Sequence, residues 1–561
     1  MTDESNHPNE ATHKSGNRKR TYIFAALCLA AAGTVVASLW SPPPLPEPAN
    51  FDARDFERAE FRSIVADLDA AFFTKWRDRG LRPAPRADDW TILRRLSLGL
   101  TGTVPSLEEV RALEKVSEEQ RIQWWLTYLF EDRRYSDYMA ERFARAYVGV
   151  ENGPFLIYRR RKLTTFLSDE FLANRPYDKL TRKLVASQGV WTSQPEVNFI
   201  TATVTKDPET DKSRPDVIKL AARTTRAFLG VRIDCVQCHD DMFGDHWKQE
   251  HFHQLAAFYA GSDTGLTGVR DDDSRPYEFR YLKETDKETV PAVVPFRQDL
   301  LPKEGSLRER LARWMTHPEN RSFARTTVNR VWALLFNKPM LTPIDDIPLD
   351  GNFPPGLEIL ADEFIASGYD IQHLVRVIAA SRTFQLDSRS DDENNPITES
   401  HEFNWASFPL TRLRPDQVVG SLLQASSLRT INADAHIVKR AMRYFSQQDF
   451  VKRFGDVGED EFGEHAGTIP QRLLMLNGKL VHERTKENMF LNASTRIATV
   501  APNEEEMIRT AYMCILTRQP TKTELDHFAS RLKKSGENSR KVEMTDLYWT
   551  LMNSTEFSWN H

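Results

Sequence analysis

The sequence contains few cysteines and none of the common nucleotide-binding or nucleophile motifs. Its 561 residues include four cysteines, too few for a disulfide scaffold. No Walker loop, dinucleotide fingerprint or nucleophile elbow occurs in it. The net charge is −5 at pH 7, so the chain has no global basic field that would attract nucleic acid. We therefore expect no nucleic-acid partner.

A run without charged residues near the N-terminus predicts a membrane segment. Residues 22–40 are about long enough to cross a bilayer as a helix. The preceding tail, 1–21, ends in a positive cluster, which is expected to stay cytoplasmic and to place the bulk of the chain in the periplasm or elsewhere outside the cytoplasm. The run ends in a mediocre cleavage site, so we favour an uncleaved anchor over a signal. Residues 41–50 are rich in proline and predict an extended spacer.

Alternating apolar runs, which are typical of half-buried strands, are scarce, and most segments repeat apolar residues at helical spacing. The length exceeds what a single hydrophobic core usually supports. The fold class that we predict is mainly α, multi-helical, with two helical domains after an N-terminal transmembrane helix. The predicted parts are a cytoplasmic basic tail (1–21), the anchor (22–40), the spacer (41–50), a cytochrome-like domain (51–261), a linker (262–302) and a C-terminal helical domain (303–561).

Individual residues mark some helix ends. Ser106 and Glu109 have the spacing of a capping box at a helix start. Pro215 is suited to a first helical turn, and Gly230 predicts the stop of the helix that follows it. That helix leads the chain to the most informative motif of the sequence.

The motif is C-x-x-C-H, formed by Cys235, Cys238 and His239. At this spacing one turn can bring two thiols to the edge of a haem, while the adjacent imidazole reaches the iron. The residue counts of this chain give roughly 0.0007 matches by chance. We therefore predict that Cys235 and Cys238 attach haem c through thioether bonds and that His239 is the metal ligand.

Two other interpretations of the motif remain open. The cysteines could hold zinc with a nearby histidine, or they could form a plain disulfide in an oxidising compartment. The same nearby histidines are the candidates for a second, distal iron ligand, whereas Met242 is too near in sequence to reach the opposite face of a haem. These histidines are His246, His251 and His253.

A second group of polar residues comprises Asp345, Asp346, Asp350 and Asn352. Their oxygens could bind a hard cation such as calcium, or a pair of the carboxylates could act in acid/base catalysis. We favour the alternative that these carboxylates cap turns and helix ends among the neighbouring prolines.

The order of several short segments carries a family resemblance. The first segment has a double Arg, a Leu-x-Leu and a Thr-Gly, and the C-x-x-C-H motif follows later in the chain. Together the segments resemble the planctomycete cytochrome-like family, in which an N-terminal cytochrome-C-like domain of unknown function precedes a C-terminal planctomycete domain of unknown function. A second His and a Pro often follow the motif in that family, and here Asp241 and Met242 stand in their places. The segments span 93–102, 228–230, 235–240, 320–332, 343–346, 517–521 and 551–557.

The resemblance implies an exported, cytochrome-like protein, but it implies no settled reaction. Our first hypothesis is a membrane-anchored, extracytoplasmic c-type haem protein that serves electron transfer or a redox step with a redox partner protein. The alternatives are an envelope hydrolase or carbohydrate-active protein, and a non-catalytic scaffold in which the motif is a zinc site or a disulfide. Whether the protein is an enzyme stays open.

Overall fold

The computed structural model divides the chain into two units, Met1–Pro46 and Glu47–His561. The predicted tail and membrane segment lie outside the described residues. None of the helices in the described ranges is both long and apolar enough to cross a bilayer. The structure describes residues 45–150, 158–206, 212–241, 247–281, 284–432, 449–455, 462, 467–489, 491–535 and 539–561.

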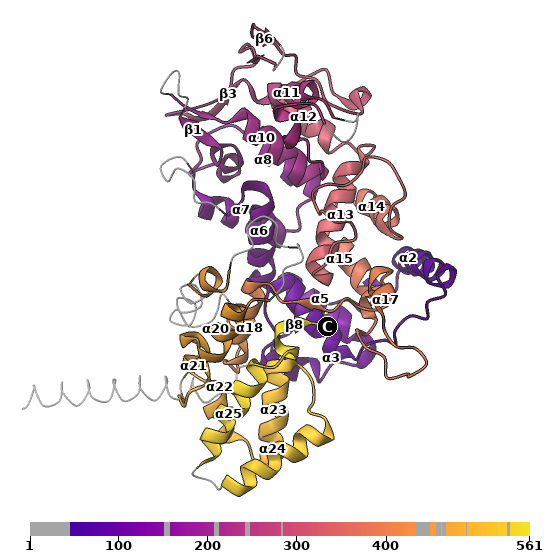
Figure 1. The fold of residues 1–561 in the computed structure, drawn as a ribbon, viewed down its shortest axis with the longest axis vertical. Coiled ribbons are helices and arrows are strands. Elements are labelled where there is room, and N and C mark those ends of the chain that lie inside the picture. The colour runs from indigo at the N-terminus through magenta and orange to yellow at the C-terminus, as the bar shows by residue number, and fades with distance from the viewer. Residues whose placement is uncertain are drawn as a thin grey trace, which may run out of the picture. The chain divides into compact units, whose positions relative to one another are not determined.

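The second unit is mainly helical, which confirms the mainly α part of the predicted class (Figure 1). The strands described in it form small antiparallel sheets of two strands each, which pair β1 with β2, β3 with β4, β5 with β6 and β7 with β8. The strands are β1 (Val204–Lys206), β2 (Ser213–Pro215), β3 (Ser262–Gly265), β4 (Gly268–Asp271), β5 (Glu278–Phe279), β6 (Glu288–Thr289), β7 (Thr411–Arg412) and β8 (Trp559–Asn560).

Of the helices before the linker, α10 and α11 pack against the segment that leads to the C-x-x-C-H motif. Two short elements lie in that segment: a π-helical turn, η3 (Thr225–Leu229), and a 3₁₀ turn, η4 (Asp234–Gln237). The α-helices are α2 (Ala59–Asp78), α3 (Asp89–Thr101), α4 (Leu107–Leu113), α5 (Glu118–Glu131), α6 (Arg133–Val148), α7 (Arg160–Leu172), α8 (Tyr177–Ala186), α9 (Asn198–Thr201), α10 (Val217–Thr224) and α11 (Gln249–Ala256).

The later helices divide between a central group and a C-terminal cluster, in which α22, α23, α24 and α25 pack on one another (Figure 1). The bounds are α12 (Leu307–Met315), α13 (Arg321–Phe336), α14 (Leu357–Ala366), α15 (Ile371–Ala380), α16 (Arg382–Gln385), α17 (Glu399–Phe403), α18 (Pro415–Ala425), α20 (Ile469–Asn477), α21 (Lys479–Thr485), α22 (Ala493–Val500), α23 (Glu504–Leu516), α24 (Lys522–Ser535) and α25 (Arg540–Met552).

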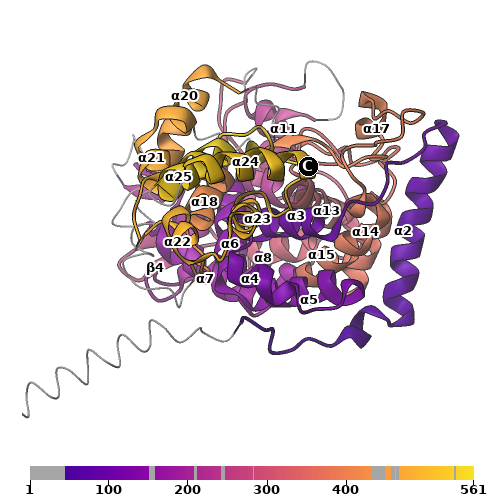
Figure 2. The ribbon, with the colours of Figure 1, turned by 90° about the horizontal axis from the view of Figure 1, so that it is seen from below.

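Helix α13 is at the centre of the core because almost all of its residues are buried. It packs against α3, α14, α15 and η3. Trp332 stacks on Phe336 with a ring-centroid distance of 4.1 Å and on Phe72 of α2 at 5.8 Å. Helix α2 in turn lies against α14 and α15 (Figure 2). Aromatic packing thus joins the first helices of the chain to the central helix.

Two of the predicted helix boundaries are confirmed, and one is wrong. Ser106 and Glu109 form the capping box of α4, and Gly230, at φ +59°, ends the turn η3. Pro215 does not start a helix, because it lies in β2, opposite Val204 in the antiparallel register. Asp216 caps α10 instead: its carboxylate accepts hydrogen bonds from the backbone N–H groups of Ile218 and Lys219.

The segment 262–302, which was predicted as a linker, contains β3, β4, β5 and β6. These strands span two to four residues, too few for alternation to be recognised in the sequence. Asp271 at the end of β4 is not on the surface, because it forms a buried ion pair of 2.7 Å with Arg308 of α12. The segment is therefore partly packed into the body.

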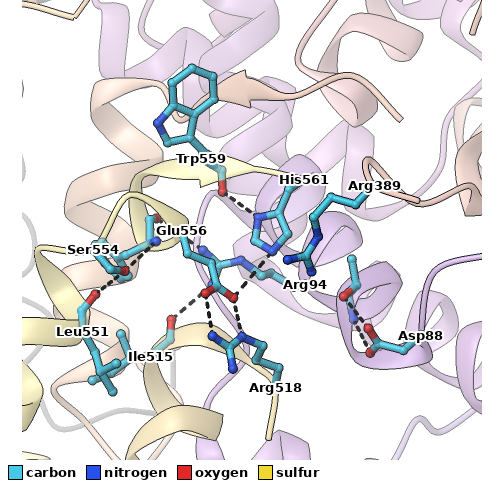
Figure 3. A network of polar contacts seen from close by, with 12 residues as sticks. Asp88, Arg94, Arg389, Ile515, Arg518, Leu551, Ser554, Glu556, Trp559 and His561 are labelled. Atoms are coloured by element: carbon cyan, nitrogen blue, oxygen red, sulfur yellow. Dashed lines mark hydrogen bonds and ion pairs between the residues drawn. The ribbon is translucent and has the colours of Figure 1, made fainter. Parts of the chain in front are cut away.

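A buried network of arginines connects α3 with the C-terminal segment (Figure 3). Arg94 donates hydrogen bonds to the carbonyl oxygens of Ile515 and Phe557. Arg95 donates to the carbonyls of Phe384, Leu386 and His561, and its guanidinium lies 3.6 Å from the ring centroid of Phe408. Burial lowers the pKa of Arg95 to about 9.

Arg518 and Glu556 extend this network. The carboxylate of Glu556 accepts hydrogen bonds of 2.5 and 2.7 Å from Arg518, which also pairs with Glu524 at 2.9 Å. The imidazole of His561 lies 3.8 Å from Glu556 (Figure 3). We call Arg94, Arg95, Arg518, Glu556 and His561 the arginine network. It joins residues more than 400 positions apart in the sequence.

Candidate functional site

The C-x-x-C-H motif begins on the turn η4, which Cys238 caps, and His239 follows directly. The side chains of Cys235 and Cys238 are exposed and not joined in a disulfide. Val236 between them is 2% exposed, so it anchors the turn in the core. The spacing therefore gives one buried residue and two accessible thiols, the arrangement that covalent attachment of a ligand requires.

The imidazole of His239 is exposed, and its orientation is fixed by a backbone contact. Its Nδ1 lies 2.7 Å from the carbonyl oxygen of Asp240. Because a carbonyl oxygen can only accept a hydrogen bond, Nδ1 must carry the proton, which leaves the lone pair of the neutral ring on Nε2. Metal-binding histidines commonly use this arrangement to orient the ring and set its tautomer.

Helix α11 holds the motif turn in place through the backbone. The carbonyl oxygen of Gln237 accepts hydrogen bonds from Gln249 Nε2 at 3.1 Å and from His253 Nε2 at 3.0 Å. The carboxylate of Asp240 accepts one from the backbone N–H of Gln249 at 2.8 Å. These contacts satisfy an orphan N–H at the start of α11 and fix the chain on both sides of Cys238.

His253 supports the turn and has no ring nitrogen available for a metal in this structure. It is 1% exposed, and Nε2 donates to the Gln237 carbonyl while Nδ1 lies 2.8 Å from the Tyr277 hydroxyl. The ring of Phe279 stacks on it at a centroid distance of 3.4 Å. Burial lowers the pKa of His253, which favours the neutral ring.

The other two histidines proposed as ligands differ in position. His251 Nδ1 accepts a hydrogen bond of 3.2 Å from the backbone N–H of Lys248 at the start of α11. His246 lies outside the described residues, as does Met242. Among the residues that the structure describes, no group of three or more His, Cys, Asp or Glu side chains is placed to hold a metal ion.

Asp345 is bound by arginines and caps no turn or helix end. One carboxylate oxygen accepts from Arg232 Nε and the other from Arg226 Nε, both at 2.8 Å. Burial opposes ionisation, but these two arginines outweigh it and lower the pKa of Asp345. The carboxylate is therefore an ionised partner in an ion pair and is poorly suited to act as a general acid.

The other members of the proposed calcium group do not join Asp345. Asp346, Asp350 and Asn352 are exposed, and they form no metal-binding group within the described ranges. The helix-capping interpretation that we favoured for Asp345 is also wrong, because its partners come from the segment around η3 and η4. Sequence reasoning missed Arg226 and Arg232, since neither stands in a recognisable motif.

The ion pairs at Asp345 connect the second half of the chain to the flank of the motif turn. Arg226 also lies 3.7 Å from Asp234, the residue before Cys235. The backbone N–H of Ile347 donates to the carbonyl of Gly230 at 2.7 Å. A Cβ at Gly230 would lie 2.6 Å from Thr326 Oγ1 of α13. Glycine is thus required here both by the close approach and by the positive φ.

A cavity lies next to these ion pairs, between the end of α6, helix α10, the turn η3 and helix α13. We call this cavity the basic pocket, because four cationic side chains line it together with Asp345. These are Lys219, Arg223, Arg226 and Arg330.

Comparisons with known families account for both halves of the chain. Residues 67–264 match the family model PSCyt2, described as "Protein of unknown function (DUF1549)". Residues 307–532 match the model PSD1, described as "Protein of unknown function (DUF1553)". The chain belongs to this two-domain planctomycete family. No curated protein and no solved structure matches it.

This assignment confirms the resemblance seen in the sequence. The PSCyt2 segment contains the motif turn, and the PSD1 segment contains Arg330 and Asp345. The basic pocket is therefore lined by residues of both segments. Since both family descriptions give the function as unknown, what the site does must be argued from its residues.

Proposed function

We propose that this protein is a c-type haem protein in which Cys235 and Cys238 form the thioether bonds and His239 Nε2 is the iron ligand. The observation that carries the proposal is the state of the three side chains. Two exposed, unpaired thiols flank a buried anchor residue, and the Nδ1–H···O=C contact leaves Nε2 of His239 available. This donor set fits haem c.

The role that we propose is electron transfer with a redox partner protein. Haem, when bound, would supply a one-electron couple. The thiols and imidazole are on the surface, so a cofactor attached there would be accessible to a partner. His253 and Gln249 would keep the attachment turn in position through the Gln237 carbonyl.

We further propose that the protein acts outside the cytoplasm, tethered by residues 22–40. The charge-free run and the basic cluster before it support this location. Covalent attachment suits such a protein, because a thioether-linked cofactor cannot be lost outside the cell.

The test is to produce the full chain with a periplasmic haem-maturation system. We expect a Soret band and a peroxidase stain that persists through denaturing electrophoresis, because thioether bonds survive unfolding. The double variant Cys235→Ser/Cys238→Ser should lose the stain completely. The matched control is Cys514→Ala, which removes a buried thiol of α23 and should keep it.

His239→Ala separates ligation from attachment. It should shift the spectrum while the stain remains, since iron ligation and thioether attachment are separate bonds. Wild-type protein with stoichiometric zinc and no haem would overturn the proposal in favour of a structural metal site. A Cys235–Cys238 disulfide in the mature protein would also overturn it.

A further inference from the structure

The described lining of the basic pocket contains more cationic than anionic side chains. Four cationic side chains line it, against one carboxylate, that of Asp345. Both oxygens of this carboxylate already accept hydrogen bonds from Arg226 and Arg232. Lys219 lies 3.8 Å from Asp216, which is at the cap of α10. The cavity lining therefore has a net positive charge.

Arg330 of α13 is the residue that most strongly indicates a ligand. It is 6% exposed and lines the cavity. Within the described ranges, no carboxylate forms an ion pair with its guanidinium, which interacts electrostatically with Tyr147 and Tyr177. A buried charge is unfavourable unless a group of opposite charge lies beside it. A guanidinium also presents five N–H donors in a planar fork that matches the oxygens of a carboxylate or phosphate.

The surroundings of Arg330 hold it in place without neutralising it. Its neighbour Asn329 exchanges hydrogen bonds with the backbone of Leu341, at 3.0 and 3.1 Å, and so fixes α13 against the following loop. The hydroxyls of Tyr147 and Tyr177 bond to each other at 2.8 Å. Burial raises the pKa of both tyrosines, so these groups stay neutral.

The basic pocket lies where several elements of the fold meet. The turn η3, which supplies Arg226, is π-helical, and π-helical turns occur frequently at functional sites. Helix α10 supplies Lys219 and Arg223, whereas α13 supplies Arg330. Cations from three consecutive turns and from a distant helix thus converge on one cavity of about 150 Å³. That size is suited to a small ligand.

We propose that the basic pocket binds a small oxyanion of the phosphate class, with Arg330 as its principal donor. The ligand would offset the buried charge of Arg330 and bridge the PSCyt2 and PSD1 segments at the ion pairs beside the motif turn. Binding needs neither Cys235 nor His239, so this proposal goes beyond haem attachment and can fail independently of it.

The experiment is a calorimetric titration of the full chain with inorganic phosphate at constant ionic strength. We expect one saturable site and a rise in unfolding temperature with phosphate concentration. Arg330→Met should weaken binding at least 10-fold, and Arg330→Lys, which keeps the charge but loses the fork, should weaken it less. Arg325→Met is the matched control: this arginine of the same helix pairs with Glu358 and should leave binding unchanged.

Two results would overturn the proposal. One is a wild-type protein in which phosphate gives no saturable heat, or no more stabilisation than chloride at equal ionic strength. The other is an Arg330→Met variant that binds phosphate as tightly as wild type. If Arg330→Met does not fold, the comparison of wild type with Arg330→Lys decides, and equal affinities there would likewise contradict the assignment.

Discussion

The motif turn at 235–239 and the arginine network are both polar, and both lie in segments that resemble the family. They differ in the burial and the hydrogen bonding of their polar groups. In the arginine network, Arg94 and Arg95 are buried and donate to backbone carbonyls of distant segments. In the motif turn, the thiols of Cys235 and Cys238 are exposed and unpaired. The buried arginines hold distant segments of the chain together, so we interpret them as structural. The exposed thiols are accessible to a ligand, so we interpret the motif turn as a binding site.

The largest effect on stability is expected in the arginine network. Arg95→Met should lower the free energy of unfolding by roughly 3 kcal/mol, because it leaves the buried carbonyls of Phe384, Leu386 and His561 without that donor. Urea denaturation measures this. The exposed Arg79 of the α2 C-cap provides the control, and Arg79→Met should stay within about 0.5 kcal/mol of wild type. Equal effects of the two substitutions would remove the distinction between buried and exposed arginines.

Local sequence signals were sufficient to predict features that depend only on neighbouring residues. The capping box of Ser106 and Glu109 and the stop at Gly230 follow from side-chain geometry within one helical turn. The spacing of Cys235 and Cys238 also indicated a site, and their attachment to haem stays a prediction.

Long-range partners could not be predicted from the sequence. Asp345 pairs with arginines more than 100 positions earlier, so a carboxylate that looked like a calcium ligand or a helix cap is part of an ion-pair cluster. Pro215 carries a helix-start signal, but its pairing with Val204 in a hairpin overrides that signal. The burial of Arg330 depends on the packing of α13 and has no local signature.

The second-largest effect is a dependence of stability on pH in the arginine network. Burial lowers the pKa of His561 below its ordinary value of 6.5, so the folded state keeps this ring neutral. As the pH falls below about 6.5, the unfolded state takes up a proton that the folded state does not, and stability is lost, by about 2 kcal/mol near pH 5. His561→Gln should flatten this slope in urea denaturation between pH 7 and 5. An unchanged slope would show that proton uptake by His561 on unfolding does not cause the loss of stability.

A smaller effect is expected at the support of the motif turn. His253→Leu should cost about 1 kcal/mol, because the Gln237 carbonyl keeps only its Gln249 donor. The matched control is His251→Gln, which can still accept the hydrogen bond from Lys248. Urea denaturation of both variants tests the assignment, and amide exchange at Cys238 should accelerate only in His253→Leu. Equal exchange rates in the two variants would mean that His253 does not position the turn.

The smallest effect on stability is expected at the thiols themselves. Cys235→Ser/Cys238→Ser should change the free energy of unfolding of the haem-free chain by less than about 0.5 kcal/mol, since both side chains are exposed. The same urea titration measures it. A loss as large as that of Arg95→Met would place the cysteines in a structural role and would remove the contrast between the two regions.

The most direct test of haem attachment is the mass of the peptide that contains residues 235–239, taken from mature full-length protein after proteolysis. The account predicts that this peptide carries the added mass of one haem and that Cys235→Ser/Cys238→Ser abolishes the addition. A peptide of unmodified mass, from cells that attach haem to a control cytochrome, would contradict it.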